Sequence, residues 1–177
     1  MTGRQNKGRE VRLPVAGLAA LRAAVQKASG PEQAARLLQR AGIDVGRGLY
    51  ALLAEKEDPA SLPPSRFWRR ALDALRDRGW GDFVYRARHE GAAELATANG
   101  AEVTEGVNRP DCFLSAGLIA GLLAGVDAGP VAVLEVTCRS QGDPECRFLF
   151  GGRHAIASVH AALLSGADPD AALERLG

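Results

Sequence analysis

The chain has 177 residues, and its 22 lysines and arginines against 21 aspartates and glutamates leave a formal net charge of +1. This length favours one domain with a sizeable core, and the balanced charge gives no support for a polyanionic partner. No apolar stretch is long enough to span a bilayer, and the odd number of cysteines, three, favours a reducing compartment, so we expect a cytoplasmic protein.

Residues 1–12 are polar and basic, and they predict a flexible tail ahead of a single domain at 13–177. A short nucleic-acid-binding arm is the alternative, but the segment has no aromatic residue. The apolar run that follows is short, is interrupted by Pro14 and Gly17, and does not resemble a signal peptide. We therefore expect no direct contact with nucleic acid and no cleaved leader.

The first half of the chain has the spacing of amphipathic helices. Four are expected, at 14–28, 31–40, 44–53 and 67–78. Gly42 is predicted to interrupt the helical run, and Asp44 and Ser65 are good N-cap residues for the third and fourth helices. Gly46 and Gly48 are costly inside a helix unless a neighbouring helix, a subunit or a ligand approaches closely. The arginines of the fourth helix have acidic neighbours, so a self-paired solvated face is expected rather than a phosphate or lipid contact.

The second half alternates strand and helix patterns. Strands are expected at 80–89, 92–97, 101–107, 131–138 and 146–150. Helices are expected at 112–126, 153–164 and 169–176. The pattern predicts an α+β fold in which an antiparallel sheet is packed with helices.

Three thiols and one carboxylate are concentrated between residues 111 and 150. All three cysteines lie there, Cys112 at the start of a helix, Cys138 and Cys146 on either side of a predicted hairpin turn. Glu135 lies in an otherwise apolar strand that is expected to be buried, where an unpaired carboxylate is costly. Four ligands of these types are the usual count for a closed tetrahedral zinc site.

The same residues allow other interpretations. Three cysteines can be ordinary core residues, and Cys138 with Cys146 can form a hairpin disulfide that leaves Cys112 unpaired. Glu135 and Cys138 are three residues apart and face opposite sides of a regular strand, so a shared ion requires a bulge near Val136 or Thr137.

Glycines recur every fourth residue in the helix at 112–126, at Gly117, Gly121 and Gly125, and leave one face nearly bare. Close packing against the sheet is the expected use of this face, and a wall for a flat ligand is the alternative.

Three motifs resemble those of the 4-vinyl reductase domain, a hydrocarbon-binding domain: P-D-C-F-L-S-A-G-L-I-A-G-L-L-A-G, E-V-T-C and G-D-P-E-C-R-F-L-F, in that order. The chain is similar to the sensor domain of phenol- and xylene-responsive transcription activators, and to the fold of the TRAPP vesicle-transport subunits. A weaker resemblance upstream, through G-I-D-V-G-R-G-L-Y and the W-R-R-A-L-D-A-L-R-D-R-G-W-G-D-F run, extends the similar region to about residues 35–150.

This resemblance implies a structural zinc ion on Cys112, Glu135, Cys138 and Cys146, the positions that match the zinc ligands of the aromatic sensors. It also implies a pocket for a hydrophobic or aromatic small molecule. The candidate lining residues are Trp68, Trp80, Phe83, Tyr85 and Phe113, all of which are equally suited to the core.

The resemblance leaves two other functions open. One is an accessory factor that binds tetrapyrrole intermediates of (bacterio)chlorophyll synthesis, and the other is an interaction scaffold; a homodimer is expected in either the sensor or the scaffold case. The sequence has no G-x-S-x-G motif, phosphate loop or dinucleotide fingerprint, and its three histidines are scattered, so catalysis by this chain is not expected.

Overall fold

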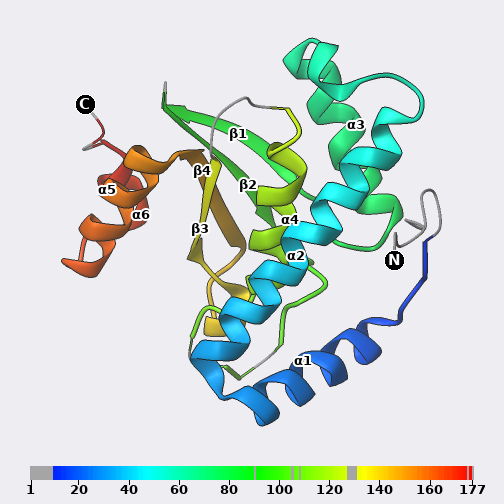
Figure 1. Cartoon of the computed structure of the whole chain (residues 1–177). Helices are drawn as coiled ribbons and strands as arrows, with labels where there is room; N and C mark the ends of the chain where they lie inside the picture. Colours follow the sequence, from blue (N-terminus) through cyan, green and yellow to red (C-terminus); the bar gives the residue numbers. More distant parts are fainter. Residues whose placement is uncertain are drawn as a thin grey trace, which may run out of the picture.

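A four-stranded antiparallel sheet in the order β1-β2-β4-β3 forms the centre of the fold (Figure 1). The computed structural model describes residues 10–89, 91–104, 106–107, 109–126, 131–174 and 176. The strands are β1 (Val84–His89), β2 (Ala92–Thr97), β3 (Val131–Thr137) and β4 (Cys146–Gly152). β3 lies at an edge of the sheet with half-buried residues, so the expectation of a fully buried strand at 131–138 is wrong.

Each face of the sheet is covered by its own helices. One face packs on α2 (Pro31–Ala54), α3 (Pro64–Asp77) and α4 (Phe113–Leu123). The other packs on α5 (Arg153–Leu164) and α6 (Pro169–Glu174). Successive residues of β4 alternate between these faces, because side chains of a strand point to opposite sides. Cys146 and Phe148 therefore face α4, whereas Arg147 and Leu149 face α5 and α6.

The N-terminal helix α1 (Val15–Ser29) precedes α2 and meets it at Gly30, whose φ of 74° allows the sharp corner. A short 3₁₀ helix, η1 (Pro59–Ser61), links α2 to α3. Among the described residues, no helix combines the length and the apolar character that crossing a membrane requires. The predicted tail at 1–12 falls mostly on residues 1–9, which lie outside the described part of the chain.

The predicted break at Gly42 is wrong, because α2 is one continuous helix of 24 residues. Gly42 and Gly46 lie where α2 crosses α4, and their missing side chains allow the two backbones to touch. A Cβ atom on Gly46 would lie 2.1 Å from the carbonyl oxygen of Leu118, and one on Gly117 would lie 2.1 Å from that of Gln39. The cost of glycine in a helix is offset here by close packing between helices.

The glycine face of α4 therefore packs against α2, and the expectation that it packs against the sheet is wrong. Gly121 contacts the backbone of Ile43, and Gly125 lies against the ring of Tyr50. In contrast, no atom of the described residues lies within 4 Å of the position that a Cβ atom on Gly48 would take, so the expected close approach there does not occur.

Other boundaries differ from the expectations. Residues 101–104 and 106–107 form turns and loop rather than a strand, and β1 begins at Val84 rather than at Trp80. Ser65 is not the cap of α3, because that helix begins at Pro64, which is pre-set for the first helical position. The expected strand at 92–97 and helix at 153–164 are confirmed.

A buried carboxylate on β2, Glu94, stabilises the face of the sheet that packs on α5 and α6. Glu94 is fully buried and accepts hydrogen bonds from Arg86 and Arg88 at 2.9 Å each and from Arg147 at 2.9 Å. Arg147 also pairs with Asp170 of α6 at 2.7 Å, so the ion network ties the C-terminal helix to the sheet. Burial alone would raise the pKa of Glu94, but the hydrogen bonds from Arg147, Arg88 and Arg86 outweigh it and hold the pKa below its ordinary value of 4.5.

The Glu94→Gln variant is expected to be less stable than the unmodified chain by roughly 3 kcal/mol near neutral pH, because the buried guanidinium of Arg147 loses its charged partner. A carboxylate with a lowered folded-state pKa stabilises the fold above its unfolded-state pKa, and this contribution is lost as pH falls through the folded-state pKa. The difference between the two proteins should therefore be full above about pH 5 and shrink as pH falls below 4.5. Denaturant titrations at several pH values measure it.

The matched control is Glu57→Gln, which removes partly exposed ion pairs with Arg66 and Arg70. It should cost less than about 1 kcal/mol at any pH. An equal loss of unfolding free energy in the two variants would show that the Glu94 network stabilises the chain no more than an exposed ion pair does.

Candidate metal centre

Three thiols and one carboxylate converge beneath the N-terminus of α4. The Sγ atom of Cys112 lies 3.8 Å from that of Cys138 and 3.7 Å from that of Cys146. With a carboxylate oxygen of Glu135, the four ligand atoms all lie within 4.8 Å of one another. We call these residues the thiol–carboxylate cluster. All three cysteines are buried and free, so the alternative of a Cys138–Cys146 disulfide is not realised.

The hairpin of β3 and β4 has the irregularity that the shared site requires. The register between the two strands shifts between Glu135 and Thr137, which is a bulge at Val136. The extra residue turns Glu135 and Cys138 to the same side, as predicted for a shared ion. Beyond the strand, the backbone N–H of Cys138 donates to the Asp143 carboxylate at 2.8 Å, which fixes the turn.

One atom of the cluster lacks a partner. The Oε2 atom of Glu135 accepts a hydrogen bond from the backbone N–H of Cys112 at 3.2 Å, whereas its buried Oε1 has no hydrogen-bond partner among the described residues. An unpaired buried carboxylate oxygen is costly, and coordination to a cation would satisfy it. Three sulfur donors and one carboxylate suit a zinc ion, so these residues fit the metal that the resemblance implies.

The titration of the cluster reflects its crowding. Burial, followed by the charge of Cys138, raises the pKa of Glu135 to about 9. Hydrogen bonds from the thiols of Cys112 and Cys146 lower the pKa of Cys138, and donation to Cys138 raises that of Cys112. In the metal-free cluster, Cys112 and Glu135 therefore hold their protons tightly, whereas Cys138 gives up its proton readily. A bound cation would have to displace the protons of Cys112 and Glu135.

A second carboxylate, Glu102, supplies the cap of α4. Its oxygens accept hydrogen bonds from the backbone N–H groups of Leu114 at 3.2 Å and Ser115 at 2.5 Å. Cys112 occupies the N-cap position but makes no side-chain cap bond, so its thiol is left for the cluster. Burial raises the pKa of Glu102, against the opposing hydrogen bonds from Ser115. The sequence reasoning missed Glu102, because the segment was predicted to be a strand.

The five predicted pocket residues do not line one common cavity. Trp68 stacks on Tyr85 with ring centroids 4.5 Å apart, and Phe150 lies 5.4 Å from Trp68. Phe83 is buried against Phe148, with centroids 6.2 Å apart. Trp80 and Phe113 are half-buried and do not join these rings. A ligand at Trp68 and Tyr85 would have to separate rings that pack on each other.

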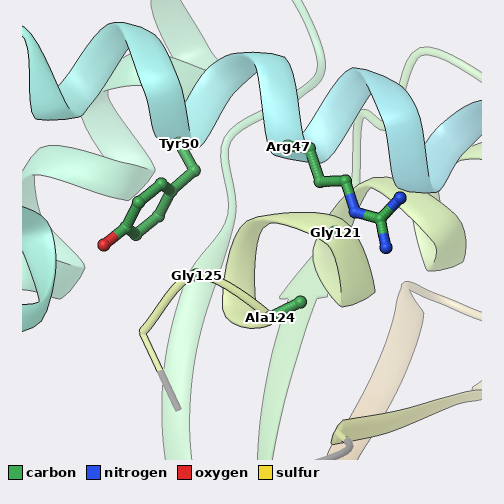
Figure 2. Close-up of a pocket in the computed structure, with 5 residues that line it drawn as sticks. All are labelled: Arg47, Tyr50, Gly121, Ala124 and Gly125. Atoms are coloured by element: carbon green, nitrogen blue, oxygen red, sulfur yellow. The ribbon is translucent and has the colours of Figure 1, made fainter. Parts of the chain in front are cut away.

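A hollow of about 190 Å³ lies elsewhere, between α2 and the end of α4 (Figure 2). Arg47 and Tyr50 reach towards it from α2, α4 contributes Gly121, and Ala124 and Gly125 directly follow the end of α4. A second hollow, of about 280 Å³, lies beside α6 and includes Arg88 and His89. None of the predicted pocket residues lines either of them.

Comparison with known proteins agrees with the fold and the motifs. Residues 94–151 match the V4R domain, and this segment contains all four residues of the thiol–carboxylate cluster. The crystal structure of the phenol-responsive sensory domain of the transcription activator PoxR with phenol superposes with a TM-score of 0.73 at 20% identity, covering 88% of this chain and 83% of that one.

A vinyl-4-reductase family protein from Methanocaldococcus jannaschii superposes with a TM-score of 0.54 at 21% identity, covering 81% of this chain and 83% of that one. No curated protein matches the sequence. The predicted resemblance and the predicted α+β fold are thus confirmed.

Proposed function

We propose that this chain is a zinc-stabilised binding domain of the sensor type, which takes up a hydrophobic or aromatic small molecule. The observation that carries the metal part is the unpaired, buried Oε1 atom of Glu135 beside three converging thiols. A site of four protein ligands has no open position, so the ion would have a structural role. It would join the start of α4 to the β3–β4 hairpin and so hold two walls of the apolar interior together.

Two observations support the ligand part of the proposal. The V4R match covers the cluster and the strands beneath it, and the superposed sensory domain of PoxR holds phenol in its crystal structure. In this chain, a flat aromatic ligand that separated the half-buried, stacked rings of Trp68 and Tyr85 would contact an apolar face of each ring. Three free buried thiols suit a reducing compartment, which supports a cytoplasmic location.

A panel of phenols, methylbenzenes and a porphyrin is expected to contain a compound that raises the unfolding temperature. At a ligand concentration of 100 Kd, binding stabilises the folded state by about 2.7 kcal/mol, which corresponds to roughly 5–10 °C for a chain of this size. The Tyr85→Leu variant should lose most of the shift, because it removes half of the aromatic stack. Thermal denaturation with and without each compound measures the effect.

The matched control is Val84→Leu, because Val84 is the neighbour of Tyr85 on β1 and is 53% exposed. It should retain the full shift. The absence of any shift, together with a stable dimer by light scattering, would instead favour the interaction scaffold. The exposed Leu13, Val15 and Leu21, at 50%, 55% and 57%, offer an apolar surface for such a dimer. A shift with the porphyrin alone would favour the tetrapyrrole-binding accessory factor.

A further inference from the structure

The helix α1 is held by a charged residue rather than by apolar packing. Of its 15 residues, only Arg22 is buried, whereas Leu21 is 57% exposed. In Figure 1, α1 and α2 meet at this corner and lie progressively further apart away from it. A helix of this length is marginal in water by itself, so its position depends on the few contacts it makes with the rest of the chain.

Those contacts converge on Asp111 and Glu102. The Arg22 guanidinium donates to the carbonyl oxygen of Glu102 at 2.6 Å and to that of Asp111 at 2.5 Å, and it pairs with both carboxylates. The side chain of Gln26 donates to the Asp111 carboxylate at 3.1 Å. Arg22, Glu102 and Asp111 are all nearly or fully buried, so separating them would leave unpaired charge in the interior.

Asp111 directly precedes Cys112, the residue of the thiol–carboxylate cluster that lies at the start of α4. The backbone N–H of Cys112 donates to Glu135, and the Glu102 carboxylate binds the next N–H groups of the same helix. The acceptors of Arg22 are therefore fixed by the segment that the cluster holds. If Cys112 is released from the cluster, the carbonyl and carboxylate groups of Asp111 lose their fixed positions beneath α1.

We propose that α1 is a metal-dependent latch, docked through Arg22 while Cys112 is held by a bound ion and released when the ion leaves. The latch rests on the proposed zinc binding. It adds that metal binding at the thiol–carboxylate cluster decides whether α1 is docked, and so controls the position of the apolar residues of α1.

Hydrogen exchange of the full chain, read by mass spectrometry before and after zinc is removed with a chelator, tests the latch. Zinc content is measured on each sample. We expect the amides of α1 to exchange at least about tenfold faster after removal, while those of α5 change much less. The Arg22→Met variant should show the fast α1 exchange with its zinc content unchanged. The control is Arg36→Met, because Arg36 is exposed and, among the described residues, its hydrogen bonds go to Gln33 within α2.

Four outcomes overturn the latch. Slow α1 exchange in a sample shown to have lost its zinc contradicts the coupling, and slow exchange in Arg22→Met contradicts the role of Arg22. Equal loss of protection in α1 and α5 on zinc removal means that the whole chain unfolds and that α1 has no separate release. A preparation that binds no zinc at all refutes the proposed metal centre as well, which the zinc measurement distinguishes from the first two results.

Discussion

The Cys138→Ser protein is expected to purify with almost no zinc, whereas the unmodified chain should carry close to one ion. A serine oxygen is a much poorer zinc ligand than a thiolate, and the Sγ atom of Cys138 lies within 4.8 Å of every other ligand atom of the cluster. Because a structural zinc ion contributes its binding free energy to folding, the free energy of unfolding should fall by more than about 4 kcal/mol. Elemental analysis and denaturant titration measure the two effects.

Two controls separate metal loss from the loss of a buried thiol. Treating the unmodified chain with a chelator should cost as much stability as the substitution, and the chelator should cost the variant nothing further. Ser158 is exposed on α5, so adding Ser158→Cys to the variant restores three cysteines without restoring the cluster. Zinc should remain absent from this double variant. Full metal content in Cys138→Ser would contradict the proposed centre.

Gly46→Ala and Gly48→Ala are expected to change stability in opposite directions, although they are two residues apart in α2. A Cβ atom at position 46 would lie 2.1 Å from the Leu118 carbonyl oxygen and 2.6 Å from the Leu122 nitrogen, and neither backbone atom can move cheaply. We expect a loss of more than about 2 kcal/mol. At position 48, the described part of the chain has no atom within 4 Å of the Cβ position, so alanine should stabilise the helix by up to about 1 kcal/mol.

Chemical denaturation of the two variants beside the unmodified chain measures these differences. If both substitutions stabilise the protein, the backbones of α2 and α4 are further apart than described. If both destabilise it, position 48 has a contact that the structure does not account for.

The four residues of the candidate centre were identified through the resemblance to the aromatic sensors, because their spacing alone left a disulfide and ordinary core cysteines open. The hairpin turn and the helix start follow from neighbouring residues, whereas the approach of Cys112 to Cys138 and Cys146 depends on how α4 packs against the hairpin. The continuous α2 was missed because helix propensity alone penalises Gly42, and the compensating contact comes from α4, more than seventy residues later. Propensity is overridden by packing at such crossings.

The role of Glu102 as the cap of α4 and the location of a ligand pocket could not be predicted from the sequence, for different reasons. Glu102 meets Arg22 across eighty positions of the chain, and no local pattern marks either residue as buried. Aromatic residues suit a core and a ligand wall equally, so Trp68 and Phe83 could not be assigned to one or the other from their identity. The structure places Phe83 in the core and Trp68 in a half-buried stack.

The alternation along β4 makes a slipped hairpin intolerable. Cys146 faces α4 while its neighbour Arg147 reaches Glu94 and Asp170 on the opposite side. Sliding the strand by one residue would exchange them, placing a guanidinium among apolar side chains and a thiol among arginines. The partners of Cys146 on one face and those of Arg147 on the other therefore both favour the same strand register. A chain that has lost one of these two sets of contacts still has the other to maintain the register of β4.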